Sequence, residues 1–215
     1  MPQAADITVV IASFRYGHLA AQAVDSVVCQ TLRPARIYLV DDGVGDCRHI
    51  AGLYPEVSFL EREANLGIVA NFNDMLQRVE TGRVLFLGAD NWLRLDALEL
   101  LAPHVADIVS YDLALVGTER EAFAAGVGAA EREHGHPVWR FDPNGDMAAG
   151  NVIHGSSLYN ADLAKKLGYA ASGNLRSEED WVLFRRMLAA GATHTHVAEP
   201  LLYYRRHRQN YNAPG

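Results

Sequence analysis

Two short acidic segments lie where carboxylates could bind a ligand. Asp41-Asp42-Gly43 follows the apolar run 36–40, and Gly88-Ala89-Asp90-Asn91 follows the apolar run 84–87. Carboxylates placed after a strand can accept hydrogen bonds from a ribose hydroxyl or a base N–H, and they can hold a hard divalent cation such as Mg²⁺ or Mn²⁺. The same residue types form turns and begin helices, so each segment alone fits both a binding site and a turn.

A third acidic segment lies in the last quarter of the chain. Ser177-Glu178-Glu179-Asp180 precedes an apolar stripe of Trp181, Phe184 and Leu188, which predicts a helix from about 178 to 190. Acidic residues in a first helical turn are stabilised by the helix dipole. Alternatively, one of these carboxylates faces a ligand cleft and acts as a general base.

The segment 203–208 combines two tyrosines with three arginines and His207. Folded over a diphosphate, it would neutralise a leaving group; otherwise it is a basic surface tail. Asn65-Leu66-Gly67 fits a helix cap that also faces a ligand. The paired histidines at 134/136 and 194/196 have no third ligand near them in the sequence, which argues against a metal site there.

The arrangement of predicted elements would bring several of these segments together. Apolar runs predict strands at 7–11, 36–40, 57–60, 84–87 and 108–111. Helical spacing predicts helices over about 19–28, 46–53, 68–79 and 95–101. This alternation predicts an α/β fold with a mainly parallel sheet flanked by helices, in which ligands collect beyond the carboxyl ends of the strands.

The second half of the chain breaks this rhythm. Residues 118–146 read as a long excursion or mobile insertion, followed by a strand around 152–159, a helix near 161–167 and a terminal segment that ends with residues 201–205. We expect a single domain over 1–215. Its parts would be a nucleotide-binding half at about 1–111, a variable excursion at about 112–150, and an acceptor or catalytic half at about 151–215.

The composition limits the possible functions. The sequence is 49% hydrophobic and 21% charged, which is typical of a globular protein, and its net charge of −7 argues against a nucleic-acid binder. Cys29 and Cys47 form no metal or disulfide pattern, the N-terminus has no secretory pattern, and no apolar run is long enough for a membrane span. We therefore expect a cytoplasmic protein, with the inner membrane face as an alternative location.

The order of the segments resembles family-2 glycosyltransferases, enzymes of the GT-A fold that move a sugar from a nucleotide diphosphate to a hydroxyl acceptor. Residues 9–15 and 23–31 resemble the family's first strand and its SVLxQT helix. Residues 37–43 resemble its VDDGS segment, and Asn65-Leu66-Gly67 with Asn71 resembles NxGxxxARN. Residues 179–186 and 199–207 resemble its EDxxLxxR helix and its closing xPLxxYRxH segment.

The sequence departs from the family pattern at three positions. Gly88 replaces the first Asp of the metal motif, which weakens a metal or ribose contact. Ala12 and Arg15 replace a proline and an asparagine after the first strand, and Arg15 could instead approach a phosphate.

The resemblance implies an inverting transfer with Asp180 as the general base. A nucleotide-sugar donor, with a UDP-sugar favoured, would be bound by Ala12, Ser13, Arg15, Asp42, Asn65, Gly67, Asp90, Arg205 and Arg206. A divalent cation, Mn²⁺ or Mg²⁺, would be held by Asp90 and His207. The acceptor would be a hydroxyl-bearing glycan or a lipid-linked molecule.

Two other functions stay open. A binding or scaffold protein that kept the GT-A fold and lost turnover is compatible with Gly88. A nucleotidyltransferase on a similar sheet is less favoured, because the chain lacks a Gly-rich first turn that would hold a triphosphate.

Overall fold

The computed structural model describes residues 5–148, 150–171, 179–208 and 210. Ser177 and Glu178, the first residues of the third acidic segment, lie outside this part. The first half of the chain forms β1 (Ala5–Ser13), α1 (Gly17–Val28), β2 (Pro34–Asp41), β3 (Val57–Glu61), α2 (Ile68–Arg78), β4 (Arg83–Gly88), β5 (Trp92–Leu93), α3 (Ala97–Leu101) and β6 (Ile108–Val116).

The second half adds shorter strands and three more helices among the described residues. These elements are α4 (Arg120–Gly126), β7 (Arg132–Glu133), β8 (His136–Trp139), β9 (Leu158–Asn160), α5 (Ala161–Leu167), α6 (Glu179–Ala189) and β10 (His194–Arg205).

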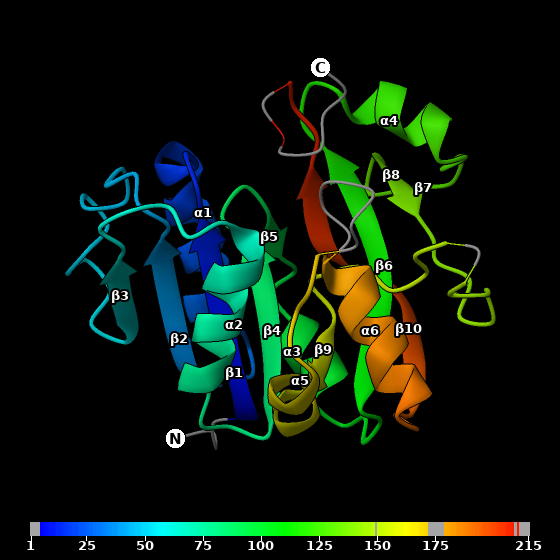
Figure 1. Cartoon of the computed structure of the whole chain (residues 1–215). Helices are drawn as coiled ribbons and strands as arrows, with labels where there is room; N and C mark the ends of the chain where they lie inside the picture. Colours follow the sequence, from blue (N-terminus) through cyan, green and yellow to red (C-terminus); the bar gives the residue numbers. More distant parts are fainter. Residues whose placement is uncertain (1–4, 149, 172–178, 209, 211–215) are drawn as a thin grey trace.

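The strands form a mainly parallel sheet, as the sequence predicts. The strand order is β3-β2-β1-β4-β9-β6-β10-β5, and β7 and β8 form a hairpin attached to β6. The pairs β2–β3, β1–β2, β1–β4 and β6–β10 are parallel, whereas β9 lies antiparallel between β4 and β6. The parallel strands therefore all end at one edge of the sheet, the upper edge in Figure 1.

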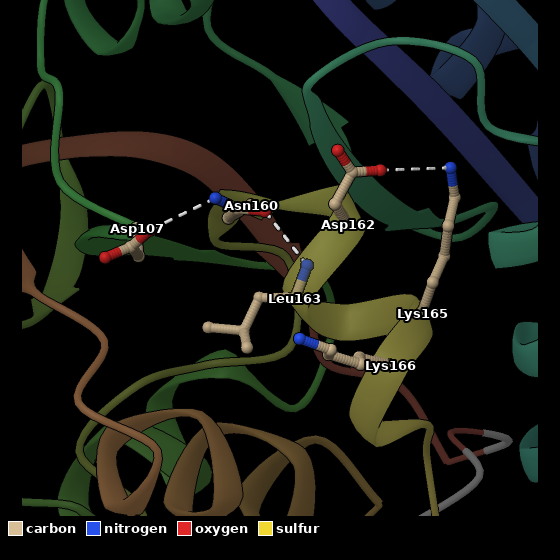
Figure 2. A pocket seen from close by; sticks show the side chains of 6 residues that line it. All are labelled: Asp107, Asn160, Asp162, Leu163, Lys165 and Lys166. Atoms are coloured by element: carbon tan, nitrogen blue, oxygen red, sulfur yellow. Dashed lines mark hydrogen bonds and ion pairs between the residues drawn. The ribbon is translucent and has the colours of Figure 1, made fainter.

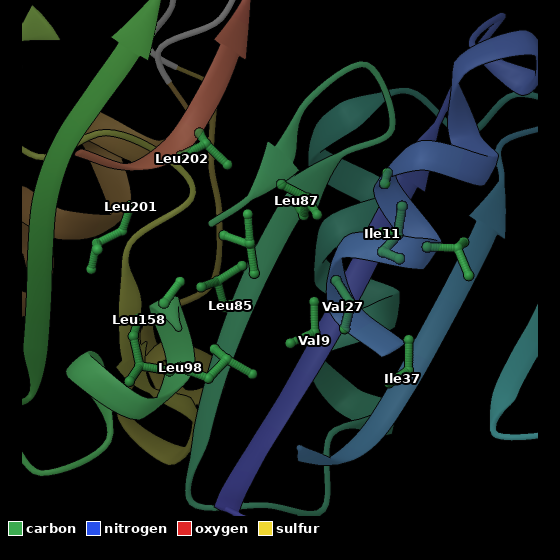
Figure 3. Close-up of a cluster of buried hydrophobic side chains, with 14 of the residues drawn as sticks. Val9, Ile11, Val27, Ile37, Leu85, Leu87, Leu98, Leu158, Leu201 and Leu202 are labelled. Atoms are coloured by element: carbon green, nitrogen blue, oxygen red, sulfur yellow. The ribbon is translucent and has the colours of Figure 1, made fainter. Parts of the chain in front are cut away.

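Helices cover both faces of the sheet, so most residues of the central strands β1 and β4 are apolar. Side chains of Val9 and Ile11 pack on one face with α1 and α3 (Figure 3), and Val10 packs on the other with α2 and α6. Burying each such side chain contributes about 1.5–3 kcal/mol to folding. The core thus fixes β1 at the centre and sets where the strand ends lie.

The predicted helix over 46–53 is wrong, because these residues form turns. The buried Asp41 carboxylate accepts hydrogen bonds from the amides of Val44, Gly45 and Cys47 at 2.9–3.0 Å. These bonds hold the start of the segment at Asp41, and the amides of Ile50, Ala51 and Leu53 bond to carbonyls three residues back, not four as in an α-helix.

The predicted strand around 152–159 is largely wrong, since only its last two residues belong to β9. Ser157 folds back on His154, donating to its carbonyl from both the amide (3.1 Å) and the hydroxyl (2.8 Å). The predicted terminal segment is β10, which begins at His194 and ends at Arg205.

The excursion at 118–146 is folded rather than an unstructured insertion, since it contains α4, β7 and β8. Its far end is attached to the sheet at Asp112, whose carboxylate accepts from the Phe141 amide at 3.0 Å and from Arg140 at 2.7 Å. In the described part of the chain, no helix has the length and apolar character needed to cross a bilayer.

Candidate active site

The parallel strands bring several predicted site residues to the same edge of the sheet. Ala12 pairs with Val40 on one side and with Gly88 on the other, so the ends of β1, β2 and β4 are level. The segment after β10 reaches the same edge, because the Arg205 amide donates to the Asn91 side chain at 2.8 Å. Residues far apart in the sequence thus meet at one place (Figure 1).

Asp41 and Asp42 have different roles. Burial acts to raise the pKa of Asp41, but hydrogen bonds from the backbone amides of Cys47, Val44 and Gly45 outweigh it and hold the pKa below its ordinary value. Asp41 is therefore a structural anion. Asp42 is 4% exposed, and its Oδ1 accepts from the Leu66 amide at 3.0 Å.

The Asp42 segment contacts the segment that carries Asn65 and Gly67. A Cβ at Gly43, where φ is +81°, would lie 2.2 Å from the Asn65 amide nitrogen, so only glycine allows this approach. Asn65 accepts from the Gly67 amide and Gly67 begins α2, with both residues exposed at the edge of the sheet. The structure therefore brings Asp42, Asn65 and Gly67 together.

Asp90 is surrounded by polar groups. It is 7% exposed, and its carboxylate accepts from the side chains of Asn91 at 3.0 Å and Asn210 at 2.9 Å. His207 Nε2 lies 3.5 Å from Asp90 Oδ2. Burial raises the pKa of Asp90 above its ordinary value, although the charge of His207 opposes this.

Arg205 is held beside Asp90. Its Nε donates to the Asp90 carbonyl at 2.8 Å, its guanidinium lies 4.8 Å from the centre of the Trp92 ring, and a further N–H donates to Gln22. These contacts fix a positive charge at the edge where a leaving diphosphate would need one.

Asp90 and His207 fit a divalent cation as a partial ligand set. Their oxygen and nitrogen atoms converge at 3.5 Å, and carboxylate and imidazole are both ligands of Mn²⁺. Another group of potential ligands, Asp41, Asp46 and Cys47, is less suited. Both Asp41 oxygens already accept hydrogen bonds from backbone amides. Burial raises the pKa of Cys47 to about 12, so the thiol stays protonated.

The side chains of Arg206 and Arg15 contact groups outside the cluster around Asp90. Arg206 is 5% exposed, its guanidinium lies 4.2 Å from the centre of the Phe123 ring, and it donates to the Tyr204 hydroxyl at 3.1 Å. It fills the space between β10 and α4. Arg15 follows β1 with an exposed side chain and a φ of +67°, stacked on its neighbour Phe14.

Asp180 lies in the first turn of α6. Residues 190–193 connect the end of α6 to the start of β10, so α6 begins toward the carboxyl edge of the sheet (Figure 1). A Cβ at Gly155 would lie 2.9 Å from Asp180 Oδ2. Burial, assisted by the charge of Glu179, raises the pKa of Asp180 to about 7. A carboxyl group that titrates near neutrality is suited to accept a proton.

The order of these residues along the chain matches a known family. A sequence profile described as Glycosyl transferase family 2 matches residues 8–139, from β1 to the end of β8. This chain belongs to that family.

Known proteins similar to this family-2 chain are longer. The chain is 26% identical over 106 residues to Glycosyltransferase GlyA of Streptococcus pneumoniae, covering 47% of this chain and 15% of GlyA. Residues 1–349 of S. aureus TarS superpose with a TM-score of 0.69 at 16% identity, covering 93% of this chain and 60% of TarS. Mannosyltransferase PcManGT of Pyrobaculum calidifontis gives 0.66 at 16% identity, covering 97% of this chain and 59% of PcManGT. These likenesses show that the fold is the mixed α/β GT-A fold.

One departure from the family-2 pattern has a steric explanation. A Cβ at Gly88 would lie 2.9 Å from Asp90 Oδ1 and 3.0 Å from Asn91 Nδ2. The Asp90–Asn91 pair thus occupies the space into which a side chain at position 88 would project.

Asn210 was missed by the sequence reasoning. It is 8% exposed and donates to Asp90, and its Oδ1 accepts from the His207 amide at 2.6 Å. An asparagine three residues after a histidine matches no sequence motif. Only its contacts with Asp90 and His207 in the folded chain identify it.

The structure also has two pockets near charged residues. One, of about 390 Å³, is lined by Thr118, Glu119, His207 and Arg208, next to Asp90. The other, of about 610 Å³, lies at the opposite, amino edge (Figure 2). Several of its polar groups contact one another, since Asn160 donates to Asp107 at 3.1 Å and Lys165 lies 3.5 Å from Asp162. We therefore place the candidate site at the carboxyl edge.

Proposed function

We propose that this protein transfers a sugar from a nucleoside-diphosphate sugar to a hydroxyl acceptor with inversion at the anomeric carbon. The observation that carries this proposal is the convergence of the Asp42 segment and the Asp90–His207 pair at the end of a family-2 sheet. Structures of TarS with UDP-GlcNAc and of PcManGT with GDP-Man and Mn²⁺ support the donor class. A UDP-sugar is the favoured donor.

The nucleoside would bind across the ends of β1 and β2. Asp42 would accept a hydrogen bond from the base or the ribose, with the backbone of Ala12 and Ser13 beside it. The segment with Asn65 and Gly67 forms the neighbouring wall. Arg15, exposed after β1, could reach a phosphate.

The leaving diphosphate would lie next to Asp90. Asp90 and His207 would hold a divalent cation, Mn²⁺ or Mg²⁺, and such an ion neutralises the charge that develops on the leaving oxygen. Arg205 adds a fixed positive charge beside it. Arg206, which packs between β10 and α4, is a further candidate for a phosphate contact.

Asp180 is the proposed general base. The acceptor oxygen forms a bond to the anomeric carbon while the bond from that carbon to the diphosphate oxygen breaks. The hydroxyl proton passes to Asp180 and the electron pair of the broken bond leaves with the diphosphate. A base in this position typically contributes about 10²–10⁴-fold to the rate.

The expected acceptor is a hydroxyl-bearing glycan, free or lipid-linked. The cytoplasmic location of the protein stays a prediction.

The Asp180→Asn variant tests the base assignment. It removes the proton acceptor while keeping the shape, so single-turnover sugar transfer should fall by about 10²–10⁴-fold while calorimetry shows unchanged affinity for UDP or GDP. Transfer at the wild-type rate would refute the assignment. Glu121→Gln, an exposed change on α4, serves as the control.

A scaffold role is the second candidate, favoured by Gly88 and by the raised pKa of Asp90. A wild-type protein that binds UDP or GDP but transfers no sugar from any nucleotide sugar to any acceptor or to water would support the scaffold. Turnover with a single donor would exclude it.

A further inference from the structure

The start of the excursion is locked to the segment that carries His207. The Arg206 amide donates to the Val116 carbonyl at 2.8 Å, and the Glu119 amide donates to the Arg206 carbonyl at 3.1 Å. A Cβ at Gly117 would lie 2.4 Å from the Arg206 carbonyl oxygen, so the two segments approach closely only because residue 117 is glycine. The backbone therefore fixes Glu119 relative to His207.

The pocket between these segments is of ligand size and is lined by residues with polar side chains. Its volume of about 390 Å³ falls within the range of small-molecule sites, and its lining residues are Thr118, Glu119, His207 and Arg208. Toward sugar hydroxyls, the Thr118 hydroxyl can donate and accept, the Glu119 carboxylate can accept, and the Arg208 guanidinium can donate. This lining suits a hydroxyl-rich ring better than an apolar ligand.

The Glu119 carboxylate is available to a ligand. Its contact to Arg208 Nε is long, at 3.4 Å, and the side chains of Arg208 and Glu119 are 90% and 40% exposed. Exposed ion pairs of this kind contribute little free energy, so a ligand hydroxyl can replace the arginine.

The position of the pocket favours the acceptor over the donor. The pocket shares His207 with the Asp90 site, whereas Asp42 follows β2, which β1 separates from β4. The expected nucleoside contact and the pocket thus lie on opposite sides of Asp90 along the edge of the sheet. A ring in the pocket would lie beside the diphosphate and away from the base.

We propose that Glu119 and Thr118 bind hydroxyl groups of the acceptor, and that the acceptor therefore carries a pyranose ring. This proposal rests on the glycosyl transfer proposed above. Glu119 would accept from two neighbouring hydroxyls, and the Thr118 hydroxyl would bind a third.

Binding of simple pyranosides tests this proposal. Methyl glucoside, galactoside and mannoside are titrated into the protein with saturating UDP or GDP and followed by ligand-observed NMR. We expect at least one to bind, Glu119→Gln to weaken it about tenfold or more, and Thr118→Val to weaken it severalfold. Glu121→Gln, on the same helix but paired with Arg132 outside the pocket, should bind like the wild type.

Two further arms identify the role of Glu119. Arg208→Gln should leave pyranoside binding intact or tighten it; a loss as large as that of Glu119→Gln would mean that Glu119 acts only by holding Arg208, and would overturn the proposal. If Glu119→Gln weakens UDP-GlcNAc or GDP-mannose but not UDP or GDP, the pocket holds the donor's sugar, which also overturns the assignment.

The outcomes separate this proposal from the proposed function. A protein that binds nucleotides and transfers sugar, yet binds no pyranoside or binds it equally after Glu119→Gln, refutes the acceptor pocket alone. A protein that binds pyranosides through Glu119 but never binds a nucleotide refutes the proposed function and leaves the pocket as a sugar-binding site.

Discussion

Gly88 and Asp90 share a space that leaves little room for a side chain at position 88. The carboxylate of Asp90 is held there by Asn91 and Asn210, with His207 3.5 Å away. A side chain at position 88 would start 2.9 Å from that carboxylate. The glycine is therefore part of the arrangement that orients Asp90 toward His207.

Replacing this glycine should disturb Asp90 specifically. In Gly88→Ala, the added methyl forces Asp90 and Asn91 to move, which should cost about 1–3 kcal/mol of unfolding free energy and weaken Mn²⁺-dependent nucleotide binding. Thermal unfolding and calorimetry measure the two effects. Gly126→Ala, where a Cβ would meet nothing within 4 Å, is the matched control. Unchanged nucleotide binding in Gly88→Ala would contradict this account of Asp90.

The raised pKa of Asp180 predicts that both stability and activity depend on pH. Its pKa is raised from the ordinary 3.8 to about 7, so the folded protein binds this proton more tightly than the unfolded chain. The free energy of unfolding should therefore fall as the pH rises from about 4 to about 7, whereas kcat/KM should rise through pH 7 as the base ionises. Urea titrations and rate profiles check both. Asp180→Asn should remove this part of the stability decline; an unchanged pH dependence would contradict it.

Among the elements, the excursion depends on a buried polar network. Asp112 on β6 accepts from the Phe141 amide and from Arg140, and His196 on β10 lies 3.0 Å from the same carboxylate. The other nitrogen of His196 contacts Ser110 at 2.8 Å. One carboxylate thus connects two strands of the sheet to the end of the hairpin, and the hairpin lies between α4 and the sheet.

Removing that charge should loosen the excursion. Asp112→Asn keeps the shape but removes the anion beside His196 and one of the two carboxylates that pair with Arg140, which should cost about 1–3 kcal/mol of unfolding free energy. Denaturant unfolding measures it, and hydrogen exchange should increase at 136–141. Arg132→Gln, which breaks an exposed pair with Glu121, should change stability by less than about 0.5 kcal/mol. Equal effects of the two changes would show that Asp112 is not the anchor.

At the scale of the whole molecule, the sheet gathers strand ends from both halves of the chain. Apolar clusters on its two faces hold the strands, and the polar groups lie beyond their carboxyl ends. A ligand that contacts both Asp42 and Asp90 would bridge the ends of β2 and β4, which lie on either side of β1. Binding should therefore stabilise the fold as a unit.

This coupling predicts a thermal shift. UDP or GDP at about 100 times its Kd should add about 2.7 kcal/mol to the unfolding free energy and raise the Tm. Mn²⁺ should increase the shift, and EDTA should reverse that increase. In Asp90→Asn, the nucleotide shift should remain and the Mn²⁺ increment should disappear. An increment that persists in this variant would exclude Asp90 as a metal ligand.

The sequence by itself determined the parallel sheet and the placement of Asp42 and Asp90. The run 7–11 is β-branched throughout and the run 84–87 is apolar throughout, as expected of strands that are buried on both faces, and parallel strands of this kind end at one edge. The helix expected at 46–53 is a series of turns instead, in which the Ile50, Ala51 and Leu53 amides bond to carbonyls three residues back. A short apolar pattern does not distinguish such turns from a helix.

Only the tertiary structure decided which polar groups meet at the site. Asn210 reaches Asp90 across 120 positions of sequence, Arg206 is covered by Phe123 of the excursion, and Glu119 lies beside His207 through backbone pairing. These contacts join segments that no periodicity links. Hydrophobic patterning is a local property that sets the elements, whereas the choice among several arginines and carboxylates depends on distances that exist only once those elements are packed.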